Sequence, residues 1–108
     1  LPDINRDRGH VLENIVYLEL RRRGYTVYVG QLTKGEIDFV AQKPGGILEY
    51  YQVSESVLDP TIRNRELAPL EAVKDQYPKF LLTMDELYKP HNYNGIQQCN
   101  VLDWLLGM

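Results

Sequence analysis

Apolar and polar residues follow a helical period over the first part of the chain. The apolar positions recur three or four residues apart, at Leu12, Ile15, Val16 and Leu20. This spacing places them on one stripe of a helix that faces a core. Arginines fill the expected last turn at residues 21–23, where cations suit the helix dipole, and Gly24 follows as a stop signal. The pattern predicts a helix from a cap within residues 3–7 to about Arg23.

Three strands are predicted to follow this helix, at residues 25–29, 36–42 and 47–54. Each is rich in β-branched and aromatic residues, which favour strands. Residues 43–46, with the sequence Lys-Pro-Gly-Gly, mark a tight turn between the last two strands. Because the connections are short, we expect the three strands to pair as an antiparallel meander.

A second helix is predicted to begin at Asp59-Pro60, since aspartate caps helices and proline suits the first helical position. It should run to about Gln76, with an interruption or kink near Pro69. The remaining elements are expected to be strands at residues 79–84 and 96–101, a polar loop between them at 85–95, and a short helix at 102–106.

The resulting order, α-β-β-β-α-β-β-α, favours an α/β fold in which helices cover both faces of one mixed sheet. The third and fourth strands flank a helix, so we expect them to be parallel and joined by a right-handed crossover. A chain of 108 residues, 44% apolar and 25% charged, has the size and composition of a single domain over residues 1–108.

Charge and cysteine content narrow the classes of function. The net charge of −3 excludes a polycationic domain, so any nucleic-acid contact must use a local patch. Cys99 is the single cysteine, which excludes an internal disulfide and suits a reducing cytoplasm. No apolar run approaches the roughly 18 residues of a membrane span, so we expect no membrane contact. Because the chain begins with Leu1, we expect it to be a domain of a longer protein.

Two acidic residues fall within a predicted strand, where acidic residues are uncommon. Alternation puts Glu36, Asp38 and Val40 on one face and Ile37, Phe39 and Ala41 on the other. Asp38 therefore points away from the most apolar face. Two interpretations remain open: Asp38 faces solvent, or it lines a polar site.

Gln52 is a second unexpected polar residue in a strand. If Asp38 and Gln52 meet, a hard cation such as Mg²⁺ could bind weakly between their oxygen atoms. An ideal two-residue turn would instead place Asp38 opposite Tyr51. An irregular turn or a bulge, which Gly45 and Gly46 allow, would bring Asp38 opposite Gln52.

Glu13 lies beside the apolar stripe of the first helix, either as a solvated carboxylate or as a further member of the site. His10, three positions earlier, could share a metal with it, but no third ligand is evident. Seven arginines are open to two interpretations: they contact phosphate, or they cover solvated helix faces. They are Arg6, Arg8, Arg21, Arg22, Arg23, Arg63 and Arg65.

Together these residues resemble the PD-(D/E)XK nuclease superfamily, which has the restriction-endonuclease fold. The resemblance rests on Glu13, on Gly-Glu-Ile-Asp at 35–38 and on Gln-Val-Ser at 52–54. It implies a three-layer α/β/α fold and a Mg²⁺ site that cleaves a phosphodiester of DNA. It also assigns the catalytic positions: Asp38 is the strand aspartate, Glu13 the helix glutamate, Gln52 the triplet acid and Ser54 the lysine. The implied metal ligands are Glu13, Asp38 and Gln52, and Glu36 could add another.

Two departures from the nuclease pattern weaken the expected activity. Gln52 brings no charge to a metal ion, and Ser54 cannot offer the positive charge of a lysine. The loss of one charge-stabilising group typically costs ~10²–10³ in rate. We therefore expect Mg²⁺ binding to be weak or absent and catalysis to be impaired.

A closer resemblance spans nearly the whole chain. It rests on GHVLEN at 9–14, RRGYTVYVG at 22–30, GEIDFV at 35–40, YQVS at 51–54 and YPKF at 77–80. These stretches are similar to an uncharacterised prokaryotic family in which the domain follows a P-loop ATPase domain of the AAA type. The resemblance implies that ATPase domain as a partner. The P-loop motif itself is missing from this sequence, so we expect no nucleotide site in this chain.

Three functions remain open at this point. The first is a nuclease-like domain that binds DNA or a partner protein without efficient cleavage. The second is a residual Mg²⁺- or Mn²⁺-dependent DNA nuclease that uses Glu13, Glu36, Asp38 and Gln52. The third is a structural or dimerising appendage of the ATPase, which would make the protein a homo-oligomer.

Overall fold

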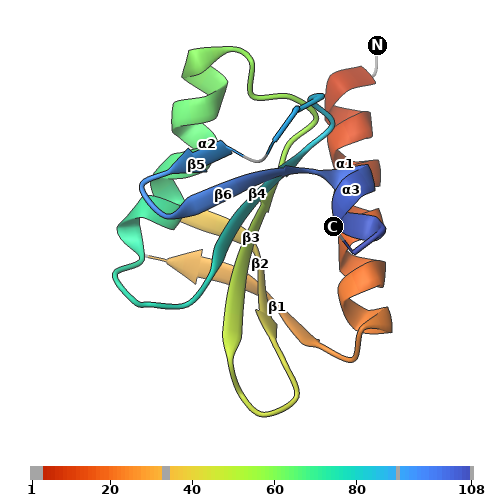
Figure 1. The fold of residues 1–108 in the computed structure, drawn as a ribbon, viewed down its shortest axis with the longest axis vertical. Coiled ribbons are helices and arrows are strands. Elements are labelled where there is room, and N and C mark those ends of the chain that lie inside the picture. The colour runs from red at the N-terminus through yellow and green to blue at the C-terminus, as the bar shows by residue number, and fades with distance from the viewer. Residues whose placement is uncertain (1–3, 33–34, 90, 108) are drawn as a thin grey trace.

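The computed structural model describes residues 4–32, 35–89 and 91–107. The elements in those ranges are α1 (Ile4–Arg22), β1 (Thr26–Leu32), β2 (Gly35–Gln42), β3 (Leu48–Val53), α2 (Pro60–Ala72), β4 (Lys79–Thr83), β5 (His91–Tyr93), β6 (Ile96–Asn100) and α3 (Val101–Leu105). The strands form one mixed sheet in the order β1-β2-β3-β4-β6-β5 (Figure 1). Helices α1 and α3 pack on one face and α2 on the other, which confirms the predicted α/β class.

The strand pairing agrees with most of the predicted topology. Strands β1, β2 and β3 form an antiparallel meander, and β4 joins β3 in parallel after α2. The prediction of a loop over residues 85–95 is wrong because it missed β5; residue 90 lies outside the described ranges. Asn94 and Gly95 have φ of 53° and 95°, the geometry of a two-residue hairpin turn that joins β5 to β6.

The two long helices differ from their predictions in detail. Helix α2 continues through Pro69 and ends at Ala72 rather than near Gln76. The chain turns there because the carboxylate of Asp75 accepts hydrogen bonds from the N–H of Tyr77 and from Lys79. The side chains expected to cap α1, within residues 3–7, lie outside the described side chains. No described helix is long and apolar enough to cross a membrane.

Helix α1 faces the sheet with a narrower stripe than its sequence predicts. Leu12, Val16 and Leu20 are buried, as expected. Ile15 is exposed, contrary to prediction, and it lies with Val11 and Leu18 on the outer surface of the helix. The buried residues are four positions apart and form one line along the helix, and Tyr17 beside this line packs against Phe39 of β2.

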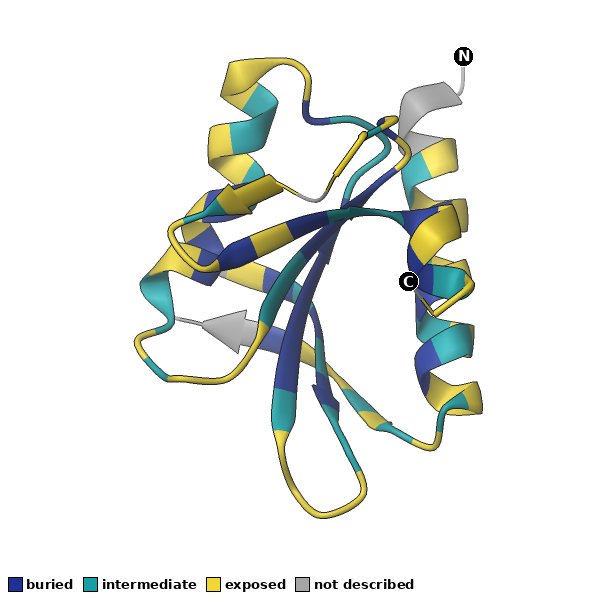
Figure 2. Cartoon of the chain, in the orientation of Figure 1, coloured by how far each residue is buried: buried dark blue, intermediate teal, exposed yellow. Residues whose placement is uncertain are grey.

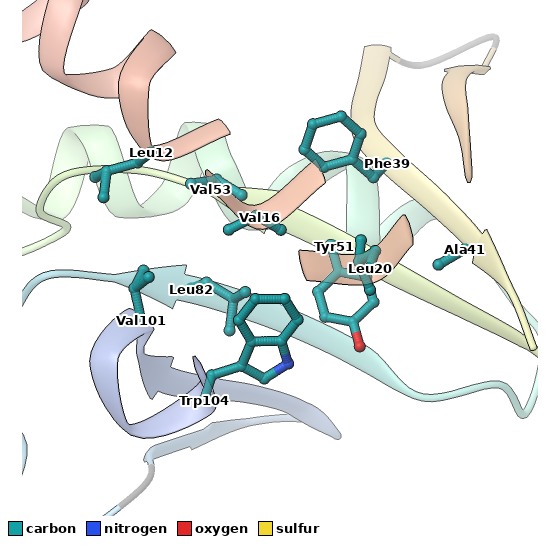
Figure 3. Packing of buried hydrophobic residues seen from close by; sticks show 10 residues of the cluster. All are labelled: Leu12, Val16, Leu20, Phe39, Ala41, Tyr51, Val53, Leu82, Val101 and Trp104. Atoms are coloured by element: carbon teal, nitrogen blue, oxygen red, sulfur yellow. The ribbon is translucent and has the colours of Figure 1, made fainter. Parts of the chain in front are cut away.

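Two apolar clusters lie on opposite faces of the sheet, because successive strand residues point to opposite sides. Tyr51 and Leu82 face α1 and α3, whereas Tyr50 and Leu81 face α2. Buried positions accordingly concentrate in the central strands and on the inner sides of the helices (Figure 2). In the first cluster Trp104 of α3 approaches Tyr51, with ring centroids 5.7 Å apart (Figure 3).

A register shift in β2 divides the apolar residues that were expected to share one face. Tyr28 pairs with Val40 and Gly30 with Ile37, so Asp38 and Phe39 both lie opposite the single residue between Tyr28 and Gly30. Ile37 therefore packs in the α2 cluster, whereas Phe39 and Ala41 pack in the α1 cluster. The bulge needs a glycine, since a Cβ atom at Gly30 would lie 2.9 Å from Cγ2 of Val40.

Candidate functional site

The ladder between β2 and β3 ends next to the predicted site. Backbone pairs run from Gln42–Leu48 to Phe39–Tyr51, which puts Asp38 level with Gln52. The alternative register, with Asp38 opposite Tyr51, is wrong. The turn is irregular as expected: the N–H of Lys43 donates to the carbonyl oxygen of Ile47, and Gly45 and Gly46 have φ of 103° and 98°.

Side chains take over from the backbone where this ladder ends. The N–H of Asp38 donates to Oε1 of Gln52 (2.7 Å), and the N–H of Val53 donates to Oδ2 of Asp38 (2.8 Å). Nε2 of Gln52 donates to the carbonyl oxygen of Glu66 (3.1 Å) and lies 3.4 Å from its Oε2. Asp38 and Gln52 thus meet, and Gln52 joins β2 and β3 to α2.

A cleft of about 690 Å³ opens beside this junction. Its charged and polar lining includes His10 and Glu13 from α1, Ser54 after β3, and Arg65 and Glu66 from α2. Asp38 and Gln52 do not line it, but they bond to Val53 and Glu66, which do. Four of the predicted site residues, Glu13, Asp38, Gln52 and Ser54, therefore gather in one region, whereas Glu36 is exposed and lines neither described cleft.

The carboxylates around the junction resist ionisation. Burial raises the pKa of Asp38 to about 7, and the charges of Glu13, Glu66 and Glu36 add to this rise, although the N–H of Val53 opposes it. Burial also raises the pKa of Glu66; Arg65 opposes that rise and Glu13 adds to it. Asp38 is therefore divided between its two protonation states near neutral pH.

Ser54 occupies the position that the resemblance assigns to a lysine. Its hydroxyl donates to the carbonyl oxygen of Ser56 (3.1 Å), and its N–H donates to the carbonyl oxygen of Leu82 (3.0 Å). The segment after β3 is further held by buried Asp85, which accepts from the hydroxyl of Ser56 (2.6 Å) and the N–H of Val57 (2.9 Å). These bonds fix the wall of the cleft. Because a serine hydroxyl is neutral, Ser54 does not replace the charge of a lysine.

The donor atoms do not fit a preformed cation site. Both polar groups of the Gln52 carboxamide are engaged inside the protein, and one oxygen of Asp38 is bound to Val53. Across the described ranges, no three histidine, cysteine, aspartate or glutamate side chains gather closely enough to hold a metal ion. The set of Glu13, Glu36, Asp38 and Gln52 would have to rearrange before it could bind Mg²⁺.

Glu66 is a site residue that sequence reasoning missed, whereas Arg65 was among the arginines expected either to contact phosphate or to cover solvated helix faces. Glu66 follows Ile62 by four positions and precedes Leu70 by four, so it lies on the inner stripe of α2. A charged residue in the centre of such a stripe is the signal that could have identified it. Arg65 is exposed and makes no hydrogen bond or ion pair with the residues that the structure describes.

A second cleft, of about 560 Å³, lies at the end of α2 and carries less chemistry. Of its two lysines, Lys79 is bound to Asp75 (3.0 Å), and Asp75 in turn accepts from the hydroxyl of Tyr50. These groups neutralise one another and close the turn after α2. The cleft between α1 and α2 is therefore the better candidate.

Fold and site together define an α/β domain with a mixed six-stranded sheet and a polar junction at the end of its central antiparallel pair. The chain is 45% identical over 95 residues to an uncharacterised protein of Haemophilus influenzae. The match covers 88% of this chain but only 22% of that protein. No protein-family profile and no solved structure matches the chain.

Proposed function

We propose that this chain is a nuclease-like domain that binds nucleic acid at the cleft between α1 and α2 and whose cleavage activity is impaired. The observation that carries the proposal is the meeting of Glu13, Asp38, Gln52 and Ser54, which come from α1, β2 and β3. These residues are far apart in the sequence, and the resemblance to PD-(D/E)XK nucleases assigns them to one site. Glu13 and Ser54 line the cleft, and Asp38 and Gln52 bond to two other residues of its lining, which supports that assignment.

Impairment follows from the chemistry of the two substituted positions. Phosphodiester cleavage requires positive charge where negative charge develops, and each such group is worth about 10²–10³ in rate. Gln52 is neutral, and both polar groups of its side chain already form hydrogen bonds, to Asp38 and to Glu66. Ser54 donates its only hydroxyl proton to Ser56. Neither residue supplies the missing charge.

Binding of a phosphate backbone is supported by the guanidinium group of Arg65, which lines the cleft from α2. His10 lines the cleft from α1, and Glu55 at its edge is paired with Arg8 (3.1 Å). Glu13 and Glu66 oppose an anionic ligand, so we expect an affinity in the range of non-specific binding, about 10⁻⁴–10⁻⁶ M at physiological salt.

The domain is proposed to act within a longer protein, next to an ATPase domain, as the family resemblance implies. The relative from Haemophilus influenzae is long enough for further domains, since the matching residues make up 22% of it. The exposed apolar stripe of Val11, Ile15 and Leu18 on α1 offers a surface against which a neighbouring domain can pack. A second copy of the chain would compete for the same surface.

Fluorescence anisotropy and gel-based cleavage assays test the proposal with single-stranded, duplex and branched DNA. We expect binding without cleavage, in EDTA as well as in Mg²⁺ or Mn²⁺. Cleavage that disappears in Asp38→Ala would instead establish a residual nuclease. The absence of both binding and cleavage would refute the proposal and favour a structural or dimerising role.

A further inference from the structure

A glutamine stands where the resemblance implies an acid that binds a cation. Gln52 is 3% exposed, and both ends of its carboxamide are used: Oε1 accepts from Asp38 and Nε2 donates to Glu66. We infer that these bonds, the Gln52 clasp, replace the cation and hold β2, β3 and α2 together without a metal ion. The inference rests on the proposed function, because it treats Gln52 as the successor of a metal-binding acid.

Charge explains why an amide suits this position. Nε2 lies 3.4 Å from Oε2 of Glu66, so its N–H offers the positive end of a dipole to that carboxylate. A glutamate at position 52 would still accept from the N–H of Asp38, but it would place a second carboxylate against Glu66. Such a pair of buried like charges requires a proton or a cation between them. In the wild type, the N–H group of Gln52 provides the positive end of a dipole at this position, so neither a proton nor a cation is required.

Two other polar groups at the junction are also engaged within the protein. One oxygen of Asp38 accepts from the N–H of Val53, and the hydroxyl of Ser54 donates to Ser56. In the part of the chain that the structure describes, every buried side-chain nitrogen or oxygen has a hydrogen-bond partner. A cation that binds through Oε1 of Gln52 or Oδ2 of Asp38 would therefore have to displace an existing hydrogen bond.

Thermal unfolding of the full chain tests the clasp. We expect the wild-type Tm to be equal in EDTA and in millimolar Mg²⁺ or Mn²⁺ at matched ionic strength. Gln52→Glu should melt about 5–15 °C lower in EDTA, because a buried hydrogen-bond donor is lost and a charge is added. Millimolar Mn²⁺ should restore most of this loss, since it would bind the folded state of this variant.

A swapped variant provides the matched control. Gln52→Glu/Glu66→Gln exchanges the amide and the carboxylate, so in EDTA it should regain the stability that depends on the side chain at position 66, although the backbone carbonyl oxygen at position 66 still lacks its donor. If Gln52→Glu does not fold, the swap decides alone: a folded swap supports the clasp and an unfolded swap contradicts it.

Two further results would overturn the inference. The first is a wild-type Tm that rises in Mn²⁺, with the rise lost in Asp38→Asn. The second is a Gln52→Glu chain that is as stable in EDTA as the wild type. Neither readout involves nucleic acid, so a chain that fails to bind DNA would refute the proposed function while the clasp is judged by its own result.

Discussion

Replacing Asp38 with asparagine removes a charge that the folded chain keeps half-buried. The substitution preserves the hydrogen bond to β3, because an amide oxygen can accept from the N–H of Val53 as the carboxylate does. It also removes the repulsion between Asp38 and its neighbours Glu13 and Glu66. The variant therefore isolates the cost of the charge from the value of the hydrogen bond.

The expected gain in stability follows from the pKa of Asp38, which burial raises from 3.8 to about 7. Each unit of difference between the folded and unfolded pKa corresponds to about 1.4 kcal/mol of stability. The ionised carboxylate therefore lowers the free energy of unfolding by at most about 4 kcal/mol. Because the side chain is only half-buried, we expect about 2–4 kcal/mol.

Proton binding determines whether the stability difference between Asp38→Asn and the wild type grows or shrinks with pH. Between pH 3.8 and about 7 the folded chain holds a proton on Asp38 that the unfolded chain has released. The stabilising effect of this proton is complete below pH 3.8 and disappears as the pH rises through 7. Asp38→Asn should thus match the wild type in acid and exceed its stability increasingly towards pH 8.

Urea unfolding across this pH range checks the prediction, with the fluorescence of the single, buried Trp104 as the signal. Glu71→Gln is the control, since it removes an exposed carboxylate of α2 that lines the other cleft, and it should leave the pH profile nearly unchanged. A difference between Asp38→Asn and wild type that stays constant with pH would refute the reasoning. So would an asparagine variant that is less stable at pH 8.

Three other substitutions probe the cleft, the bulge and the cleft wall. Arg65→Ala should weaken DNA binding and reduce its salt dependence by about one phosphate contact. Lys74→Ala removes a charge outside the cleft and should change little in the same anisotropy titration, so equal losses of affinity in the two variants would contradict the assignment. Gly30→Ala should lower the free energy of unfolding in urea by about 1–3 kcal/mol, because its Cβ atom would lie 2.9 Å from Cγ2 of Val40. Gly9→Ala is the control: its Cβ atom would lie in open space within α1, so it should not destabilise the chain. Asp85→Ala should cost about 2–4 kcal/mol, since it leaves buried donors of the cleft wall without an acceptor; a neutral effect would show that water replaces it.

The sequence allowed the β2–β3 register to be narrowed to two choices, because turn length fixes which residues face each other. The structure selects the irregular turn, and with it the contact between Asp38 and Gln52. The bulge at Asp38 and Phe39 was not predictable from alternation, since it depends on how Gly30 of the neighbouring strand packs. A bulge is a property of two strands, and a pattern along one strand does not contain it.

The sequence carries signals for two further features that the predicted elements do not include. Asn94-Gly95 is a strong hairpin signal, yet it was assigned to a loop because β5 has only three residues. Glu66 belongs to no motif, and its spacing from Ile62 and Leu70 is the one sequence feature that places it on the inner side of α2. Which helix residues approach the site depends on how α2 packs on the sheet, and this is a tertiary property.

The charge on Asp38 bears on the choice between a binding role and a purely structural one. An asparagine would accept the same bond from Val53 at a lower cost in stability, so the fold alone does not require an aspartate. Burial likewise raises the pKa of Glu66, although its backbone carbonyl already anchors Gln52. Groups whose pKa is shifted by burial and by neighbouring charges concentrate at functional sites, where stability is given up for function. Glu66 lines the cleft together with Arg65, and Asp38 bonds to Val53 in its wall, so these shifted groups lie where the proposed binding role requires them, whereas a purely structural role gives no reason for them.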